Sequence, residues 1–173
     1  MEEWRTAVEA VGAGATADSV ESATLDFKRQ GRSRDDADKA LAEVAACFAN
    51  ARGGTVVVGV QDRPGGPDAL LGTDLDADRV LRRIYELTSP HLTVELEETT
   101  VAGKRLLVIR VPRSPEVHQV DGRATRRVVT SCEPMTASQI ASLLSERRGE
   151  DWSADDTGRS LSDVSAVALD AAV

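Results

Sequence analysis

Basic residues occur in three groups that could contact phosphates. They are Lys28, Arg29, Arg32 and Arg34, then Arg82 and Arg83, then Arg126 and Arg127. Lysine and arginine side chains neutralise phosphates and release counterions without reading bases. The first and third groups could join into one patch on the folded chain. The alternative, a solvated loop and a solvated helix face, is the commoner fate of such charge runs.

The sequence lacks the common motifs for nucleotide binding, for metal binding by paired histidines and for serine hydrolysis. Gly103-Lys104 has Glu98 where a phosphate-binding loop needs its first glycine and Arg105 where it needs a hydroxyl, so there is no nucleotide loop of standard type. His91 and His118 are not paired at helical spacing, which favours hydrogen-bonded or surface histidines over metal ligands. The absence of Gly-x-Ser-x-Gly gives a serine hydrolase no local support.

The cysteine content and the apolar runs indicate a cellular compartment. Cys47 and Cys132 are the only cysteines and form no Cys-x-x-Cys motif, so we expect both to pack as small apolar side chains in a reducing compartment. No apolar run approaches the roughly 20 residues that cross a bilayer, and the first residues lack the features of a signal peptide. We therefore expect a cytoplasmic protein without a membrane partner.

Hydrophobic periodicity predicts one α/β (mixed α+β) domain with a mixed sheet, packed helices and a β-hairpin. The expected helices are 2–11, 37–50, 76–88 and 136–148, and the expected strands are 24–28, 55–60, 93–101, 105–111 and 124–129. In the first strand, alternation points Leu25 and Phe27 inward and Asp26 and Lys28 outward. Thr136 and Gln139 have the spacing of a capping box at the start of the last helix.

The net charge of -8 lies at the two ends of the chain, since residues 21–149 contain equal numbers of acidic and basic residues. We expect an N-terminal helix in 1–13, a folded domain in 14–148 and an acidic linker or tail in 149–173, which suggests further domains of a longer chain. A neutral body with clustered bases can still bind phosphates, because a local patch acts within about one Debye length, ~8 Å at physiological salt. The acidic ends would then compete with nucleic acid for the patch.

Two segments, Glu21-Ser-Ala-Thr-Leu-Asp-Phe-Lys28 and Phe48-Ala-Asn-Ala-Arg-Gly-Gly-Thr-Val-Val-Val-Gly-Val-Gln-Asp62, resemble the Schlafen AlbA-type domain in order and spacing. A later segment, Thr125 to Thr136, is similar to the family's final strand and helix start, although Val129 replaces the usual glycine. The resemblance implies a mixed α/β module that binds DNA or RNA. The predicted contacts are Lys28, Arg29, Arg32, Arg34, Arg126 and Arg127.

The resemblance also implies an alternative, because some Schlafen proteins are metal-dependent endoribonucleases that cleave structured RNA. Their three metal-binding carboxylates match Glu21, Asp26 and Asp62 here, and Asp26 is one methylene shorter than the family's usual Glu. Such ligands suit Mg²⁺ or Mn²⁺. Otherwise Asp26 pairs with Lys28 while Glu21 and Asp62 serve in turns or caps. A third reading is a protein-interaction module or homodimer, since exposed hairpin edges pair readily.

Overall fold

A four-stranded mixed sheet forms the centre of the protein in the computed structural model, which describes residues 3–31 and 33–149. The strand order is β1-β2-β5-β4, with β1 at Leu25–Lys28, β2 at Gly54–Val58, β4 at Glu95–Val101 and β5 at Lys104–Val111. Strand β2 is parallel to β1 and antiparallel to β5. The central strand and the β4–β5 hairpin are confirmed, as is the α/β fold class.

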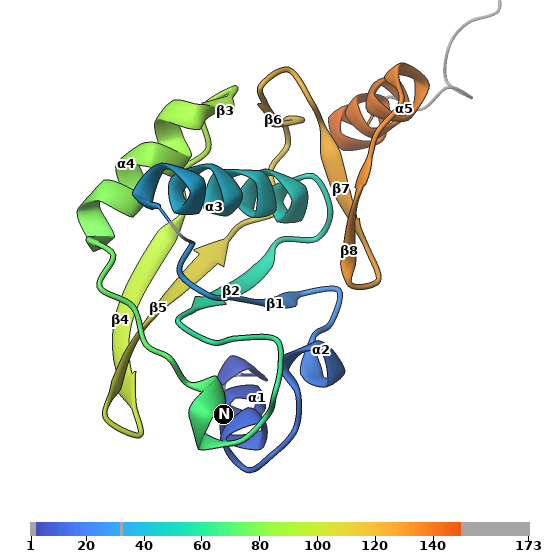
Figure 1. The fold of residues 1–173 in the computed structure, drawn as a ribbon. Helices are drawn as coiled ribbons and strands as arrows, with labels where there is room; N and C mark the ends of the chain where they lie inside the picture. The colour runs from blue at the N-terminus through green and yellow to red at the C-terminus, as the bar shows by residue number, and fades with distance from the viewer. Residues whose placement is uncertain (1–2, 32, 150–173) are drawn as a thin grey trace, which may run out of the picture.

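Helices cover both faces of this sheet (Figure 1). Helices α3 (Arg34–Ala49) and α4 (Ala77–Leu87) lie on one face, and α1 (Glu3–Gly12) lies on the other. Alternation along β2 serves both layers, because Val56 and Val58 pack in the core with α3 and α4 whereas Val57 packs in the core with α1. Strand β2 is therefore apolar on both faces.

Local capping residues set where the helices begin. Helix α3 starts at Arg34, earlier than the expected position 37, because the Ser33 hydroxyl accepts a hydrogen bond from the backbone N–H of Asp36. Helix α5 (Ala137–Arg148) begins with the expected capping box, in which Thr136 and Gln139 satisfy each other's backbone N–H groups. It ends at Arg148, as the sequence predicts.

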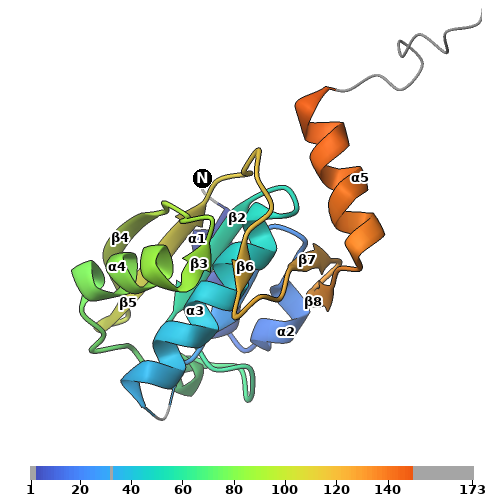
Figure 2. The same ribbon diagram turned by 90° about the horizontal axis from the view of Figure 1, so that it is seen from above.

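Several short elements lie outside the main sheet. They are α2 (Ala17–Val20), the 3-10 helix η1 (Pro67–Ala69), β3 (Thr88–Ser89), β6 (Gln119–Val120), β7 (Thr125–Val128) and β8 (Ser131–Pro134). Of these only β7 is predicted from periodicity. Strands β7 and β8 form a hairpin that lies with α5 at one side of the sheet and α3 (Figure 2).

The two cysteines correct the sequence-based expectation. Cys47 on α3 and Cys132 on β8 form a disulfide, with their Cα atoms 5.9 Å apart, so the prediction of two unpaired cysteines is wrong. The reason is tertiary: the β7–β8 hairpin folds back onto the end of α3, 85 positions earlier in the chain. The hairpin is thereby tied covalently to the helix.

Two sequence-based predictions concern residues outside 3–31 and 33–149. The acidic tail, apart from Gly149, and the basic residue Arg32 lie outside the described residues. Within 3–31 and 33–149, the structure has no helix with the length and apolar character needed to cross a membrane.

Candidate nucleic-acid and metal site

A groove of about 870 Å³ lies between α2, the edge strand β1, α3 and the β7–β8 hairpin. Its acidic residues are Asp26, Glu43, Asp121 and a group formed by Asp18, Glu21 and Asp62, and we call it the carboxylate groove after this last group. Its cationic side chains are Lys28 on β1, Lys39 on α3, Arg123 on the loop before β7 and Arg127 on β7. The groove therefore brings acidic and basic groups from distant segments of the chain together.

The three carboxylates form one cluster. Each offers an oxygen that lies within 4.8 Å of an oxygen of the other two. Asp18 lies on α2, Glu21 follows α2 directly, and Asp62 lies on the loop after β2. The backbone N–H of Ala17 donates to the carbonyl of Asp62 at 3.3 Å, which holds this loop against the start of α2.

The surroundings of the three carboxylates differ. Asp18 pairs with Arg63 at 2.9 Å near the surface. Glu21 is half-buried and accepts a hydrogen bond from the backbone N–H of Phe27 at 3.3 Å. Burial raises the pKa of the Glu21 carboxyl, and the nearby Asp26 carboxylate raises it further. Asp62 is exposed to solvent, so this carboxylate is open to an incoming ligand.

The donor set of this cluster fits a hard divalent cation. Three carboxylates supply the oxygen ligands that Mg²⁺ and Mn²⁺ prefer. A cation would also relieve the repulsion that raises the pKa of Glu21. Asp18, Glu21 and Asp62 are therefore the residues that would hold a metal here. Asp18 is absent from the sequence-based set, although its position three residues before Glu21 in a helical turn is a usable signal.

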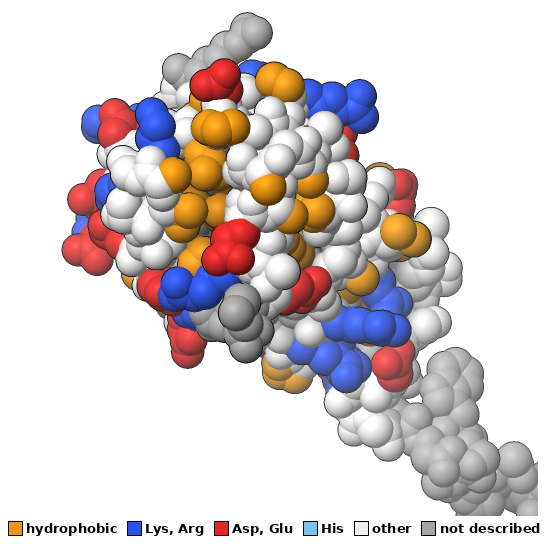
Figure 3. All heavy atoms as spheres, turned by 90° about the horizontal axis from the view of Figure 1, so that it is seen from below, with side chains coloured by type: hydrophobic (Ala, Val, Ile, Leu, Met, Phe, Trp, Pro, Cys, Tyr) orange, Lys and Arg blue, Asp and Glu red, His pale blue; other side chains and the backbone are white. Residues whose placement is uncertain are grey.

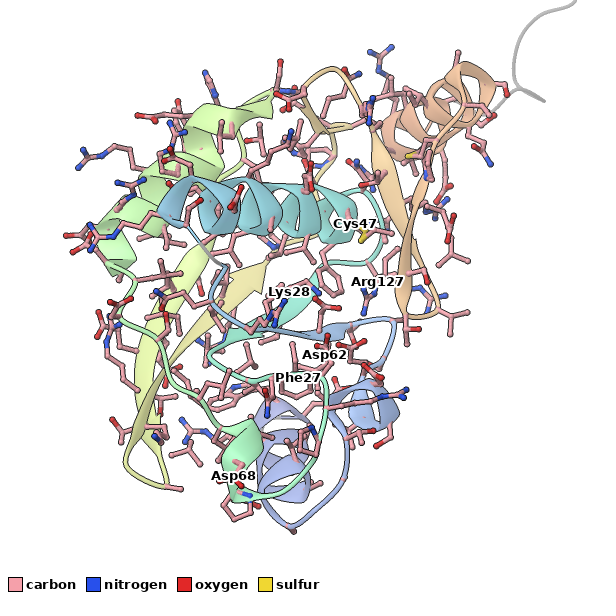
Figure 4. The ribbon with its side chains drawn as sticks, viewed as in Figure 1. Phe27, Lys28, Cys47, Asp62, Asp68 and Arg127 are labelled. Atoms are coloured by element: carbon pink, nitrogen blue, oxygen red, sulfur yellow. A yellow bond between two sulfur atoms is a disulfide. The ribbon has the colours of Figure 1, made fainter. Side chains whose placement is uncertain are left out.

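Asp26 lines the same groove but does not belong to the three-carboxylate cluster, and it forms ion pairs of its own. Alternation along β1 predicts an outward-facing side chain, and that prediction is wrong: Asp26 is 1% exposed. Its Oδ1 lies 3.0 Å from Nη1 of Arg127, and its Oδ2 pairs with the Lys28 ammonium. The hairpin covers this face of β1, so both faces of the strand are buried there. Figure 4 shows Lys28, Asp62 and Arg127 beside one another, and Asp68 far from them beside η1.

The predicted phosphate contacts differ in exposure. Arg127 has a 3% exposed side chain and donates to the backbone carbonyls of Ser22 and Leu25, so it is a structural residue in this conformation. Arg29 and Arg34 are exposed but do not line the carboxylate groove. Arg126 is exposed on the opposite face of the hairpin from Arg127. Arg123, which the sequence reasoning misses, is an exposed cation that does line the groove.

A buried asparagine fixes the segment that leads into the hairpin. Asn50 follows α3 directly and is fully buried. Its Nδ2 donates to the carbonyls of His118 and Thr125, and its Oδ1 accepts from the N–H of His118, at 2.8 to 2.9 Å. Such a side chain satisfies three buried backbone groups at once. These hydrogen bonds make Asn50 a positioning residue for the groove wall. Asn50 belongs to the second of the two segments that resemble the family.

Comparison with solved structures shows a related fold in a longer protein. The DIP2311 protein from Corynebacterium diphtheriae is similar over 97% of this chain, with 25% identity and a TM-score of 0.67. This chain spans only 37% of that protein's length. The N-terminal domain of a RecG-related protein from Nitrosomonas europaea is 23% identical, with a TM-score of 0.47, over 79% of this chain and 90% of that domain.

Comparison with families identifies the domain itself. A search of curated proteins found no significant match. The family model described as "Schlafen, AlbA_2" matches residues 21–136, a span that includes Glu21, β1, α3, Asp62 and the β7–β8 hairpin. That span covers most of the chain and contains the motifs that resemble the family, so the chain belongs to the Schlafen AlbA_2 family.

Proposed function

We propose that this protein binds nucleic acid in the carboxylate groove. The observation that carries the proposal is the presence, in one groove, of a three-carboxylate cluster opposite exposed Arg123 and the side chains of Lys28 and Lys39. Membership of a family associated with nucleic acids supports it. Both DNA and RNA present the phosphates that these groups would contact.

The cationic side chains that line the carboxylate groove differ in how available they are to a phosphate. Arg123 can contact a phosphate directly because it is exposed and because the acidic residue near it, Asp121, forms its salt bridge with Lys39. Lys28 and Lys39 are each held by one carboxylate, Asp26 and Asp121 respectively. A phosphate would otherwise be repelled by the three carboxylates, so a divalent cation at the cluster would favour binding.

Salt-dependent binding tests this proposal. Fluorescence anisotropy with labelled single-stranded and duplex DNA and RNA, across a salt series with Mn²⁺, gives the slope of log K against log [salt]. Replacing Arg123 by alanine should reduce that slope by about 0.7 to 0.9, the value of one lost phosphate contact. Arg82→Ala on α4 is the matched control and should leave it unchanged. Absence of binding to every oligonucleotide would reject the proposal, and self-association on a sizing column would then favour an interaction module.

A second function, metal-dependent cleavage of a phosphodiester, is favoured by the carboxylate cluster itself. We propose Asp18, Glu21 and Asp62 as the residues that would hold Mg²⁺ or Mn²⁺. When bound, such a metal polarises the phosphodiester and lowers the pKa of a bound water. Here we propose Asp26 as a positioning residue, because its ion pair with Arg127 connects β1 to the hairpin beside the cluster.

Cleavage is tested with labelled transfer RNA and Mn²⁺. Asp62→Asn removes an exposed ligand and should abolish product formation, whereas Asp68→Asn on η1, outside the groove, should leave it at the wild-type rate. An equal rate in Asp62→Asn and wild type, or no cutting by wild type, would reject the enzyme function and leave the binding function intact. Mn²⁺ should also raise the Tm of wild type more than that of Asp62→Asn.

A further inference from the structure

A second groove, of about 540 Å³, lies against the other side of the β7–β8 hairpin. We call it the arginine groove because Arg52, after α3, and Arg126, on β7, line it. Both side chains belong to exposed residues. Glu133 lies opposite Arg126 in the register of the hairpin and is the acidic residue of this lining. Two exposed guanidinium groups and one carboxylate therefore face the groove.

The alternation of β7 explains why neighbouring arginines serve different roles. Successive side chains of a strand point to opposite faces. Arg127 points inward to Asp26, so Arg126 must point away from that pair. The outer face of the hairpin therefore carries the charge of Arg126. The carboxylate groove and the arginine groove lie on the two sides of the hairpin.

Basic residues outnumber acidic residues in the lining of the arginine groove, where Arg52, Arg126 and Arg127 face one carboxylate, Glu133. Burial lowers the pKa of the Arg147 guanidinium on α5, and repulsion from Arg113 and Arg126 lowers it further. Glu146 offsets part of this repulsion and also pairs with Arg113 at 3.4 Å. Figure 3 shows Lys and Arg side chains gathered at the right of its face, the side on which Figure 1 places the hairpin and α5. Such a cluster favours an anionic ligand.

The rest of the arginine groove combines apolar and polar residues. Val128, Pro134, Met135 and Ala51 are among its apolar residues, and Glu133 and Gln139 are polar. At the hairpin turn, Val128 is 52% and Val129 is 74% exposed, which are large values for valine. A ligand for this surface therefore has to combine negative charge with apolar area, as the phosphates, sugars and bases of nucleic acid do.

We infer that the arginine groove binds the phosphodiester backbone of the nucleic acid that occupies the carboxylate groove, with Arg52 and Arg126 each contacting a phosphate. The inference rests on the proposed binding function and extends it to a second surface. Arg127, Pro134 and Met135 line both grooves, so one strand can pass from one to the other around the hairpin. The planar guanidinium of arginine matches the geometry of a phosphate.

The test measures the salt dependence of binding in EDTA, so that a metal at the carboxylate cluster makes no contribution. Arg52→Ala and Arg126→Ala should each reduce the slope of log K against log [salt] by about 0.7 to 0.9, and the double variant by about twice that amount. Arg82→Ala is again the charge-matched control. Arg52→Gln and Arg126→Gln, which keep more of the side-chain volume, should reproduce the loss with an unchanged Tm.

The outcomes separate the two proposals. The inference that the arginine groove binds nucleic acid would be overturned if the Arg52 and Arg126 variants both kept the wild-type slope while Arg123→Ala reduced it. The proposed function would then still hold. Failure of the wild type to bind any DNA or RNA with Mn²⁺ present would overturn both, and binding that occurs with Mn²⁺ but not in EDTA would overturn the arginine-groove inference alone. Binding of polyglutamate that weakens in Arg52→Ala, without a matching effect on nucleic acid, would assign the surface to an acidic polypeptide and overturn the inference.

Discussion

Arg127 on β7 and Asp26 on β1 form a buried ion pair, with Nη1 and Oδ1 3.0 Å apart and side-chain exposures of 3% and 2%. The same guanidinium lies 4.9 Å from the centre of the Phe48 ring. The pair fastens the hairpin to the edge of the main sheet, where the hairpin forms one wall of the carboxylate groove. A residue that the sequence indicates as a phosphate contact thus supports the structure around the site.

Replacing Arg127 by methionine should lower the free energy of unfolding by up to about 3 to 5 kcal/mol, because buried Asp26 keeps its charge and retains only the partly exposed Lys28 as an ion-pair partner. Urea denaturation of wild type and variant measures the difference. Arg126→Met, at the exposed neighbouring position, should stay within about 0.5 kcal/mol of wild type. The double variant Asp26→Asn/Arg127→Met should recover part of the loss. A cost below about 1 kcal/mol for Arg127→Met would show that the pair is dispensable.

Glu21→Gln should stabilise the protein more at neutral than at acidic pH. The pKa of Glu21 is raised above its ordinary value of 4.5, so its contribution to stability is fully present below that value and is lost as the pH rises through the folded-state pKa. Glutamine keeps an oxygen for the Phe27 N–H and carries no charge. The difference in Tm between variant and wild type, measured without metal, should therefore grow from pH 4 to pH 7. A difference that shrinks over this range contradicts the raised pKa.

Gly53→Ala should destabilise the protein much more than Gly103→Ala, although both glycines have φ near +75°. A Cβ at Gly53 would lie 2.6 Å from the carbonyl oxygen of Val111 and 2.8 Å from the backbone nitrogen of Arg113, whereas a Cβ at Gly103 would meet open space. Gly103→Ala carries only the cost of a left-handed conformation, about 1 to 2 kcal/mol. Gly53→Ala adds a backbone clash, and chemical denaturation should show at least about 1 kcal/mol more. Equal costs would refute the close approach.

Removing the disulfide with the double variant Cys47→Ala/Cys132→Ala should lower the free energy of unfolding by about 2 to 4 kcal/mol, since the cross-link closes a long loop. Wild type treated with dithiothreitol should match the double variant in a denaturation experiment, and treatment of the double variant is the control. The hairpin should become the first region to exchange its amide hydrogens once the bond is absent. Unchanged stability on reduction would show that the bond is not formed in solution.

Local sequence patterns predict most of the central fold because they depend on residues close in the chain. The β-branched run at Val56 to Val58 forms a central strand, and the Thr136–Gln139 pair caps a helix, as expected. All three predicted carboxylates, Glu21, Asp26 and Asp62, line one groove, and two of them, Glu21 and Asp62, belong to the carboxylate cluster. Periodicity misses β3 and β6, which have two residues each, and β8, whose four residues Ser131–Pro134 are all exposed and show no alternation.

Tertiary structure alone decides the chemistry of the individual side chains. The alternation of β1 correctly separates Asp26 from Leu25 and Phe27, but it carries no information about which segment covers the second face of the strand. That segment is the hairpin, about a hundred residues later, and it turns an expected surface carboxylate into a buried ion-paired one. The same folding event joins Cys47 to Cys132 and buries Arg127 while its neighbour Arg126 stays exposed. Periodicity assigns a side chain to a face, whereas the burial of that face depends on contacts between segments distant in the chain.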